Sequence, residues 1–255
     1  MAQSFRKPQI LDIARIEGRV LVDDLAARMG VTAQTIRKDL SELADAGKLE
    51  RVHGGAVLPS GTSNIAYEQR RVLQGSAKAA IGRAVAADIP ANASLFLNIG
   101  TTTEAVAREL LGHQNLLVVT NNMNVANILL ANPECEIILA GGRVRRSDGG
   151  LVGNLTVSVI EQFKFDFAVI GCSAMDDDGD LLDFDLQEVG VSQTILRHSR
   201  SAFLVSDHSK LLRSAPVRIS SLSAIDTFYT DRALPEGLAR KCRDWKTEVR
   251  LCGSD

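Results

Sequence analysis

The sequence predicts an α/β protein with an N-terminal winged helix-turn-helix domain and a C-terminal domain built on a doubly wound, mainly parallel sheet. Three observations carry this prediction. Short amphipathic helices and a hairpin fill residues 1–58, residues 59–64 are turn-forming and lack apolar periodicity, and strands alternate with helices from residue 94 onward. We therefore divide the chain into residues 1–58, a linker over 59–75, and residues 76–255.

The composition is that of a folded globular protein. Of 255 residues, 45% are hydrophobic and 24% charged, enough for one full-sized core and a second, smaller one. The net charge of -2 excludes a protein that coats nucleic acid along its length, so any DNA contact is confined to a patch. The N-terminus lacks the apolar core of a signal peptide, and no apolar run reaches the roughly 20 residues of a membrane helix. We expect a cytoplasmic protein with no membrane partner.

Three short helices are predicted in the first domain. Residues 8–17 carry apolar residues that complete a three-helix core, and residues 22–30 form an amphipathic helix closed by Gly30. Thr32 caps the third helix by accepting from exposed backbone amides. The buried stripe of this third helix consists of Ile36, Leu40 and Leu43. Two short helices joined by a tight turn are the layout of a helix-turn-helix.

The free face of the third helix and the segment after it predict a DNA-binding surface. We expect Gln34, Thr35 and Arg37 to read base edges. Residues 47–57 predict a small hairpin with a glycine tip, typical of a wing. Basic residues gather in this half of the domain, which is the local cationic face that phosphate contact requires. The residues expected along the DNA backbone, with the hairpin tip, are Lys38, Lys48, Arg51, His53 and Gly54.

Strand and helix patterns alternate through the second domain, after a helical pattern at residues 78–85. Because such alternation is typical of parallel strands joined by helices, we expect a sheet covered on both faces. The expected strands are 94–99, 116–119, 136–140, 167–171 and 202–206. The expected helices are 104–111, 125–131, 156–163 and 187–198.

Small, polar and glycine residues follow every expected strand. Sheets of this kind bind ligands where strands end and helices begin. Residues 100–103 lead into a helix and offer amides and hydroxyls to an anion such as phosphate. With the cations and the carboxylate at the other strand ends, this lining fits a phosphorylated polyol. The candidate residues are Gly100, Thr101, Thr102, Thr103, Asn121, Asn122, Gly141, Gly142, Arg143, Gly171, Asp207 and Lys210.

Metal and cofactor sites are not expected. The acidic run at residues 176–180 lacks the spaced ligands and final glutamate of an EF-hand, which favours a solvated turn. The histidines are scattered along the chain. The cysteines have no paired metal spacing and are expected to be buried free thiols; they are Cys135, Cys172, Cys242 and Cys252.

With these motifs the chain resembles the DeoR family of bacterial transcriptional repressors over nearly its full length. The motifs that carry the resemblance occupy residues 35–40, 51–56, 99–103, 119–127, 138–142, 147–150, 184–189 and 207–210. The resemblance implies a non-enzymatic repressor that binds an inverted repeat in double-stranded operator DNA as a homo-oligomer, a dimer or a tetramer. It also implies a sensor domain similar to ribose-5-phosphate isomerase. A phosphorylated polyol or sugar, glycerol-3-phosphate in particular, is then expected to release the DNA, with the rearrangement at the linker.

The chain departs from the family pattern at several positions. Lys38 stands where arginine is more frequent, which keeps the charge but not the fork that reads guanine, and so favours a phosphate contact. Asn98 stands where an aspartate is expected before the Gly-Thr-Thr-Thr loop. Gly190, Ser192 and Gln193 stand where basic residues are usual. The last four departures bear on the affinity for the effector or on its identity.

Glu188 corresponds to the catalytic base of the isomerase relatives. Those relatives carry acidic residues in the segment that matches residues 171–174, and this segment has none here. A base without partner carboxylates makes a poor proton-transfer site, so we expect Glu188 to bind the effector. Two alternatives stay open: a repressor that responds to another sugar phosphate, and a sugar-phosphate isomerase with a DNA-binding appendage.

Overall fold

Three helices enclose the core of the first domain. The structure is a computed structural model that describes residues 3–17, 19–52, 54–57 and 66–253. The helices are α1 (Gln3–Glu17), α2 (Val22–Met29) and α3 (Ala33–Asp45). All three predicted helices are confirmed, although α1 begins well before Pro8, which lies inside it. Gly30 ends α2 in the left-handed conformation, with φ at 63°.

A three-stranded antiparallel sheet completes this domain, in the order β1-β3-β2. Its strands are β1 (Arg19–Leu21), β2 (Glu50–Val52) and β3 (Gly55–Val57). The predicted hairpin is confirmed as β2–β3, whereas β1 was not predicted because three residues are too few to show alternation. Gly55 permits the pairing with β1, since a Cβ atom there would lie 1.9 Å from the Val20 carbonyl oxygen.

Seven parallel strands form the sheet of the second domain, in the order β15-β14-β12-β9-β4-β5-β6. The strands are β4 (Ser94–Leu97), β5 (Leu116–Thr120), β6 (Cys135–Leu139), β9 (Phe165–Ile170), β12 (Ser199–Val205), β14 (Thr227–Thr230) and β15 (Glu248–Leu251). The chain builds outward from β4 to β6 and then outward from β9 to β15. The strand order therefore reverses between β4 and β9, and the expected doubly wound sheet is confirmed.

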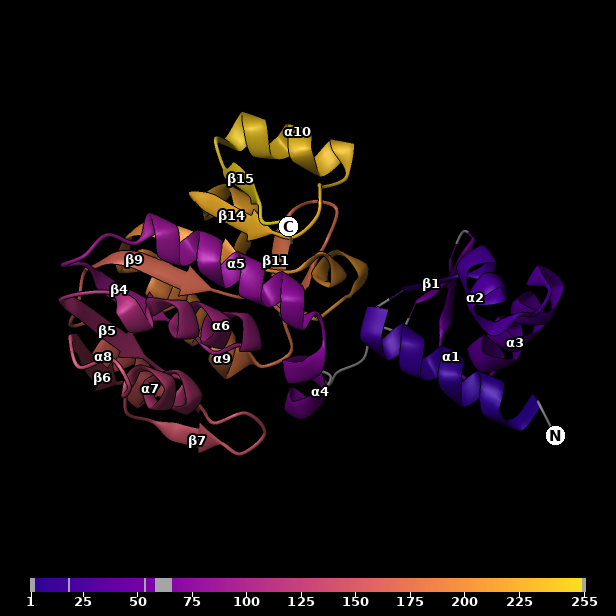
Figure 1. The fold of residues 1–255 in the computed structure, drawn as a ribbon, viewed down its shortest axis with the longest axis horizontal. Coiled ribbons are helices and arrows are strands. Elements are labelled where there is room, and N and C mark those ends of the chain that lie inside the picture. Colours follow the sequence, from indigo (N-terminus) through magenta and orange to yellow (C-terminus); the bar gives the residue numbers. More distant parts are fainter. Residues whose placement is uncertain (1–2, 18, 53, 58–65, 254–255) are drawn as a thin grey trace.

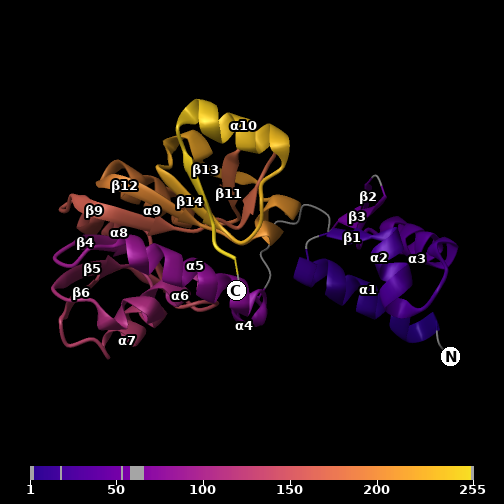
Figure 2. The same cartoon turned by 45° about the horizontal axis from the view of Figure 1, so that its top comes forward.

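Helices cover both faces of this sheet (Figure 1, Figure 2). They are α5 (Gly75–Asp88), α6 (Thr101–Glu109), α7 (Met123–Leu129), α8 (Asn154–Ile160), α9 (Leu186–Arg197) and α10 (Glu236–Trp245). Side chains alternate between two cores, so that Leu95 and Leu97 pack under α5 to α7 while Phe96 packs under α8 to α10. No helix among the described residues is both long and apolar enough to cross a membrane.

Several elements were not predicted, among them β14, α10 and β15 at the C-terminal end of the large domain and a number of shorter ones. They include α4 (Tyr67–Val72), the hairpin β7 (Arg143–Arg145) and β8 (Gly150–Val152), the small sheet of β10 (Ala174–Met175), β11 (Asp180–Asp183) and β13 (Val217–Ser221), and the turns η1 (Leu110–Gly112), η2 (His208–Leu212) and η3 (Leu222–Ala224). Most consequential is α4, which lies within the stretch assigned to the linker. Residues 59–65 of that stretch and His53 lie outside the described residues.

Candidate functional site

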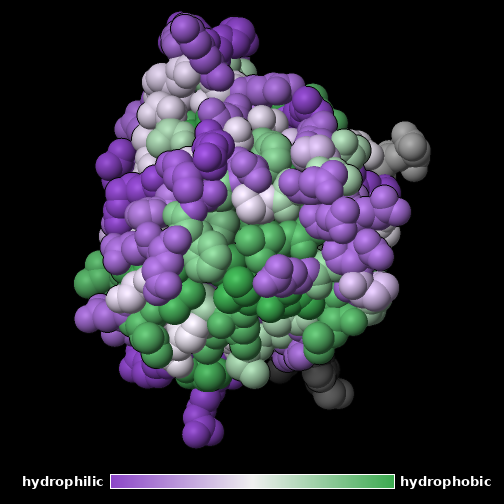
Figure 3. Space-filling model, turned by 90° about the vertical axis from the view of Figure 1, so that its left-hand side faces the viewer, coloured by the Kyte–Doolittle hydropathy of each residue, from purple (hydrophilic) through white to green (hydrophobic). Residues whose placement is uncertain are grey.

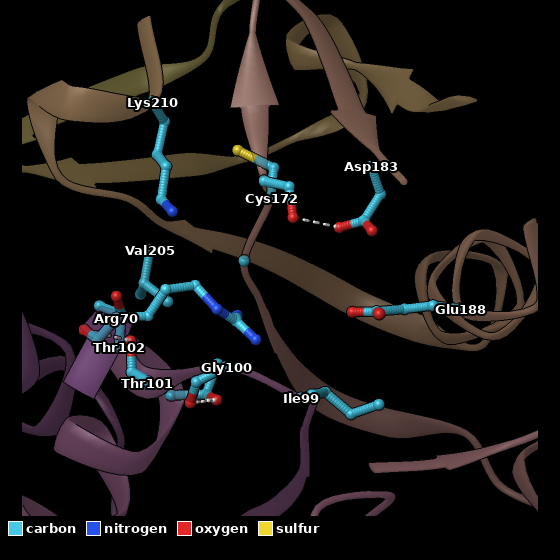
Figure 4. A pocket seen from close by; sticks show the side chains of 13 residues that line it. Arg70, Ile99, Gly100, Thr101, Thr102, Cys172, Asp183, Glu188, Val205 and Lys210 are labelled. Atoms are coloured by element: carbon cyan, nitrogen blue, oxygen red, sulfur yellow. Dashed lines mark hydrogen bonds between the residues drawn. The ribbon is translucent and has the colours of Figure 1, made fainter. Parts of the chain in front are cut away.

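A small cavity lies at the carboxyl ends of β4, β9 and β12, where the strand order reverses (Figure 4). Its volume is about 30 Å³. The residues that line it are Arg70, Ile99, Gly100, Thr101, Thr102, Thr103, Gly171, Cys172, Ser173, Asp183, Glu188, Val205 and Lys210. Seven of the residues proposed from the sequence therefore come together: Gly100, Thr101, Thr102, Thr103, Gly171, Glu188 and Lys210.

One wall of the cavity is the first turn of α6. This helix begins at Thr101, earlier than predicted, so the Gly-Thr-Thr-Thr loop and its backbone amides belong to the helix start. The Thr103 hydroxyl donates to the carbonyl oxygens of Asn98 and Gly100, both at 2.7 Å, and fixes the loop. Unpaired amides and the positive end of the helix dipole favour an anion at this wall.

Cations gather beside this wall. Lys210 and Arg70 extend into the cavity from η2 and α4 (Figure 4). Burial lowers the pKa of Lys210 to about 7, and nearby Arg213 adds to the shift while Asp207 opposes it. Burial likewise lowers the pKa of Lys78 to about 8. Within the described part of the chain, Nε and Nη1 of Arg213 are buried and have no hydrogen-bond partner. Arg70 and Lys210 are the cations that line this side of the cavity, and Arg213 acts on Lys210 from outside the lining.

Carboxylates occupy the opposite wall (Figure 4). Asp183 of β11 accepts a hydrogen bond from the Ser173 hydroxyl at 2.8 Å, and Glu188 extends from α9. Burial raises the pKa of Glu188 to about 8, with a further contribution from Asp183, against the opposing effect of Arg145. The expectation that Glu188 lacks a partner carboxylate was wrong, because Asp183 reaches the cavity from a strand that the sequence pattern did not reveal.

Arg145 links the acidic wall to its surroundings. Its guanidinium lies 2.5 Å from Glu188, 3.1 Å from Asp185 and 2.7 Å from Asp148. Arg70 lies 3.4 Å from the same Asp148 carboxylate. Glu188 is therefore held in place by Arg145, which opposes the rise of its pKa.

The other predicted effector residues do not line the cavity. Asn121 and Asn122 follow β5, one strand away from the reversal of strand order, where Asn121 donates to the Leu151 carbonyl at 3.1 Å and Asn122 caps α7. At the end of β6, the Thr156 hydroxyl donates to the Gly141 carbonyl and occupies the space that a Cβ atom on Gly142 would need. Arg143, which follows, is exposed and donates to Gln187 at 2.5 Å. Asp207 caps η2 and acts on Lys210 through its negative charge, but it does not line the cavity.

Two of the departures from the family pattern contact each other. The Asn98 side-chain amide donates to the Ser192 hydroxyl at 2.9 Å, and both residues are 1% exposed. Asn98 also accepts from the backbone N–H of Ile99 at 2.7 Å, which positions the loop before α6. A neutral hydrogen bond thus lies where the family pattern implies an acid and a base. Gly190 and Gln193 take no part in it, since Gln193 donates to the Ile219 carbonyl at 3.0 Å.

The predicted DNA-binding face is assembled on α3 and the wing. Thr32 caps α3, its hydroxyl accepting from the backbone N–H of Thr35 at 3.2 Å. Gln34, Arg37 and Lys38 are exposed on the helix. Thr35 is half-buried, and Lys48 and Gly54 are exposed. Arg51 of β2 donates to the Arg37 carbonyl at 3.3 Å and so joins the wing to the helix.

Charges on the other side of α3 attach it to α1. Asp39 is 2% exposed and pairs with Arg6, whose Nη2 lies 3.3 Å from Asp39 Oδ1. Glu42 pairs with Lys7 and lies 3.9 Å from Lys38. The sequence did carry a signal for the first pair, because Asp39 falls beside Leu40 on the buried side of the helix and a buried carboxylate needs a partner.

The remaining sequence proposals have mixed outcomes. The acidic run forms a turn between β10 and β11, in which Asp176 accepts from the backbone N–H of Asp180 at 2.8 Å. Cys242 and Cys252 are buried free thiols, but Cys135 and Cys172 are only half-buried. Across the described residues, no three His, Cys, Asp or Glu side chains are grouped as metal ligands.

Sequence comparisons match both domains. The DeoR-like helix-turn-helix domain matches residues 6–62, and the DeoR C terminal sensor domain matches residues 73–232. The glycerol-3-phosphate regulon repressor of Escherichia coli is 43% identical over 252 residues, which cover 99% of this chain and 100% of that protein. The repressor of the same name from Haemophilus influenzae is 44% identical, with coverage of 99% and 98%. The HTH-type transcriptional repressor CsqR of Escherichia coli is 38% identical, with coverage of 98% and 96%.

Solved structures are similar to the sheet domain in part. Ribose 5-phosphate isomerase A from Neisseria gonorrhoeae has a TM-score of 0.37 and 11% identity, over 53% of each chain. The eIF2B beta subunit from Chaetomium thermophilum has a TM-score of 0.46 and 13% identity, over 63% of this chain and 51% of that one. Similarity at this level carries no conclusion about activity.

Proposed function

Because this chain belongs to the DeoR family of transcriptional repressors, we propose that it binds operator DNA in the cytoplasm and releases it when glycerol-3-phosphate fills the sensor pocket. The observation that carries the effector proposal is the separation of charge across the cavity. Cations and the α6 N-terminus form one wall, and carboxylates form the other. A molecule with a phosphate at one end and hydroxyls at the other matches both walls.

The opposite charges of the two walls determine the orientation in which the effector binds. Its phosphate meets Lys210, Arg70 and the first turn of α6, where two cationic side chains and the positive end of the helix dipole favour a dianion. Its hydroxyls donate to Asp183 and Glu188 on the opposite wall. Sugar phosphates with longer chains share this chemistry, so a titration with several of them distinguishes among them.

The contact between Glu188 and Arg145 favours binding over catalysis. A general base must be free to take a proton from its substrate, whereas the Glu188 carboxylate lies 2.5 Å from Arg145. Asp183 gives the isomerase alternative a second carboxylate, so that alternative is tested directly. Conversion of ribose-5-phosphate at or above about 1 per second, the lower range for ordinary enzymes, would overturn the proposal of a repressor without catalytic activity.

Self-association follows from the proposed operator. An inverted repeat presents two half-sites, which need two copies of α3 related by a two-fold axis. The β6 edge of the sheet supports this part of the proposal, because apolar side chains gather on the side of the molecule where β6 and α8 lie (Figure 3). Leu139 and Leu155 on this side are 44% and 62% exposed.

Gel-shift titration on the DNA upstream of the chain's own gene tests the proposal. We expect glycerol-3-phosphate to dissolve the complex and free glycerol to leave it intact, because only the phosphate engages the cationic wall. If another sugar phosphate releases the DNA and glycerol-3-phosphate does not, the effector is wrong and the repressor stands. If the chain does not bind this DNA or any operator selected from random sequence, the repressor proposal fails.

A further inference from the structure

We infer that α4 is the lid of the effector pocket, and that its Arg70 changes partner from Asp148 to the phosphate of the effector when the pocket fills. This inference rests on the proposed function and adds the element that connects the pocket to the DNA-binding domain. The geometry that supports it is the small volume of the cavity, the way in which α4 is attached, and the position of Arg70 in the cavity wall.

The cavity is too small for any phosphorylated polyol. Its volume of about 30 Å³ holds two or three waters, since each needs about 10–15 Å³ of such space. Part of the wall must therefore move before an effector enters. Most of the wall consists of strand ends and of α6, which are packed into the two cores of the sheet, as the buried Val205, Val106 and Ile170 show.

The exception is α4, which has no buried residue. Polar contacts attach it to the domain. The Lys78 ammonium donates to the carbonyl oxygens of Arg70 and Leu73, the latter at 2.6 Å. The Tyr67 hydroxyl lies 3.0 Å from the Glu104 carboxylate and accepts from Asn124 at 3.0 Å. A segment held by polar contacts, with little apolar burial, opens at low free-energy cost.

Arg70 is positioned to meet the effector. Its guanidinium points into the cavity between Gly100 and Cys172 (Figure 4). Its contact with Asp148 is long, at 3.4 Å, while Arg145 binds the same carboxylate through two hydrogen bonds at 2.9 and 2.7 Å. Asp148 therefore keeps a bidentate partner when Arg70 leaves. A phosphate dianion is the stronger partner for Arg70, because it carries more charge and is not shared with Arg145.

The position of α4 in the chain couples this movement to the DNA-binding domain. It is the first described element after the wing, and the segment between them comprises residues 58–65. A shift of α4 moves the point at which the DNA-binding domain is attached. The effector then favours one arrangement of the two domains over another, which is the differential affinity that regulation requires.

A pair of adjacent arginines provides a matched test. Arg70→Gln is expected to weaken binding of glycerol-3-phosphate by tenfold or more in calorimetry, because a charge-assisted hydrogen bond to phosphate is lost. Arg71→Gln is the control, since Arg71 is half-exposed, pairs with Glu68 and does not line the cavity. Its affinity is expected to stay within about twofold of wild type. Equal affinities for the two variants, with thermal unfolding unchanged, would show that Arg70 does not bind the phosphate.

Hydrogen–deuterium exchange of the wild-type chain tests the movement itself. Saturating glycerol-3-phosphate is expected to change the exchange rate of the amides of residues 66–73 at least severalfold, while amides of β4 stay protected. If glycerol-3-phosphate binds and releases the DNA while the exchange rates of α4 stay the same, the assignment of α4 as a lid is wrong and the repressor proposal stands. If no sugar phosphate binds in calorimetry, the proposed effector pocket fails, and the lid fails with it.

Discussion

Asn98 and Ser192 form one buried contact at two positions where the sequence departs from the expected family pattern. Both side chains are 1% exposed and joined at 2.9 Å, so replacing one alone with a charged residue leaves that charge without a partner. The neutral pair keeps the loop before α6 in place through the bond from Ile99 to Asn98. We therefore interpret the two departures as one change, in which a neutral pair takes the place of the acid and the base of the expected pattern.

A double-mutant cycle checks this interpretation. Asn98→Asp is expected to lower the free energy of unfolding by about 3 kcal/mol, because it buries a carboxylate without a cation. Asn98→Asp combined with Ser192→Lys is expected to recover at least about 1 kcal/mol of this loss. Denaturant unfolding of both single variants and the double variant measures the coupling. Strict additivity of the two single effects would show that the residues are independent.

Lys210 makes effector binding depend on pH. Its pKa of about 7 is lowered mainly by burial, so it loses its proton as pH rises above neutrality. The phosphate stays dianionic there, since its second pKa is about 6, and a neutral Lys210 binds it less well. We expect Kd to rise between pH 7 and 9, by up to about tenfold per unit.

Calorimetry over this range, with Lys210→Arg as the control, checks the pH dependence. An arginine keeps its charge at pH 9, so its Kd is expected to rise much less. The control matters because Lys78 and Glu188 both have a pKa of about 8 and titrate in the same range. Equal slopes for the two proteins would assign the effect to those residues instead.

At the scale of elements, α3 has two faces with different partners. Ile36 and Leu40 are fully buried and Asp39 is tied to Arg6, so one face is committed to the domain core. The other face presents Arg37, whose carbonyl oxygen accepts from Arg51 of the wing. Helix and wing are thereby held as one surface, with the Arg37 side chain left exposed for contact with DNA.

Two neighbouring substitutions separate base contacts from phosphate contacts on α3. Arg37→Ala is expected to lose about 1–3 kcal/mol of discrimination between operator and random DNA, because a bidentate base contact is lost. Lys38→Ala is expected to weaken binding to both DNAs alike and to reduce the salt dependence. Fluorescence anisotropy on both DNAs at several salt concentrations measures the difference. Equal losses on both DNAs for Arg37→Ala would make Arg37 a phosphate contact.

At the scale of the whole molecule, the sheet has two open edges of different character. The edge strand β6 lies beside the apolar side seen in Figure 3, whereas β15 forms the opposite edge. A row of unpaired backbone groups beside apolar side chains favours pairing with another copy. Two linked copies of α3 also bind an inverted repeat far more tightly than one, because the second contact is intramolecular.

Matched lysine substitutions on the two edges test this interface. Leu139→Lys on β6 is expected to shift the oligomer toward monomer and to weaken operator binding at least tenfold. Leu251→Lys on β15 is the control, since Leu251 is similarly exposed at 59%. Sedimentation velocity gives the oligomeric state. Dissociation by Leu251→Lys alone would place the interface at the other edge.

Sequence periodicity predicted the class of both domains and five of the seven strands of the large sheet, but not β14, α10 and β15. Apolar stripes indicate which face of each helix is buried, and alternation of strands with helices indicates a parallel sheet. The two domains, the Thr32 cap and the strand-end loop before α6 could therefore be predicted. Patterns of this kind fail for short or polar elements. The three-residue β1 and the six-residue α4 have too few apolar positions to show a period.

The site itself was decided by tertiary structure. The order of strands places the ends of β4 and β9 together and leaves Asn121 and Gly142 outside, and no local pattern encodes that order. Asp183 and Arg70 reach the cavity from β11 and α4, the elements that periodicity missed. Local sequence determines which surface each element buries, because burial is a property of its own side chains. Which elements meet depends on the packing of the whole chain, and that packing assembled the charged walls of the pocket.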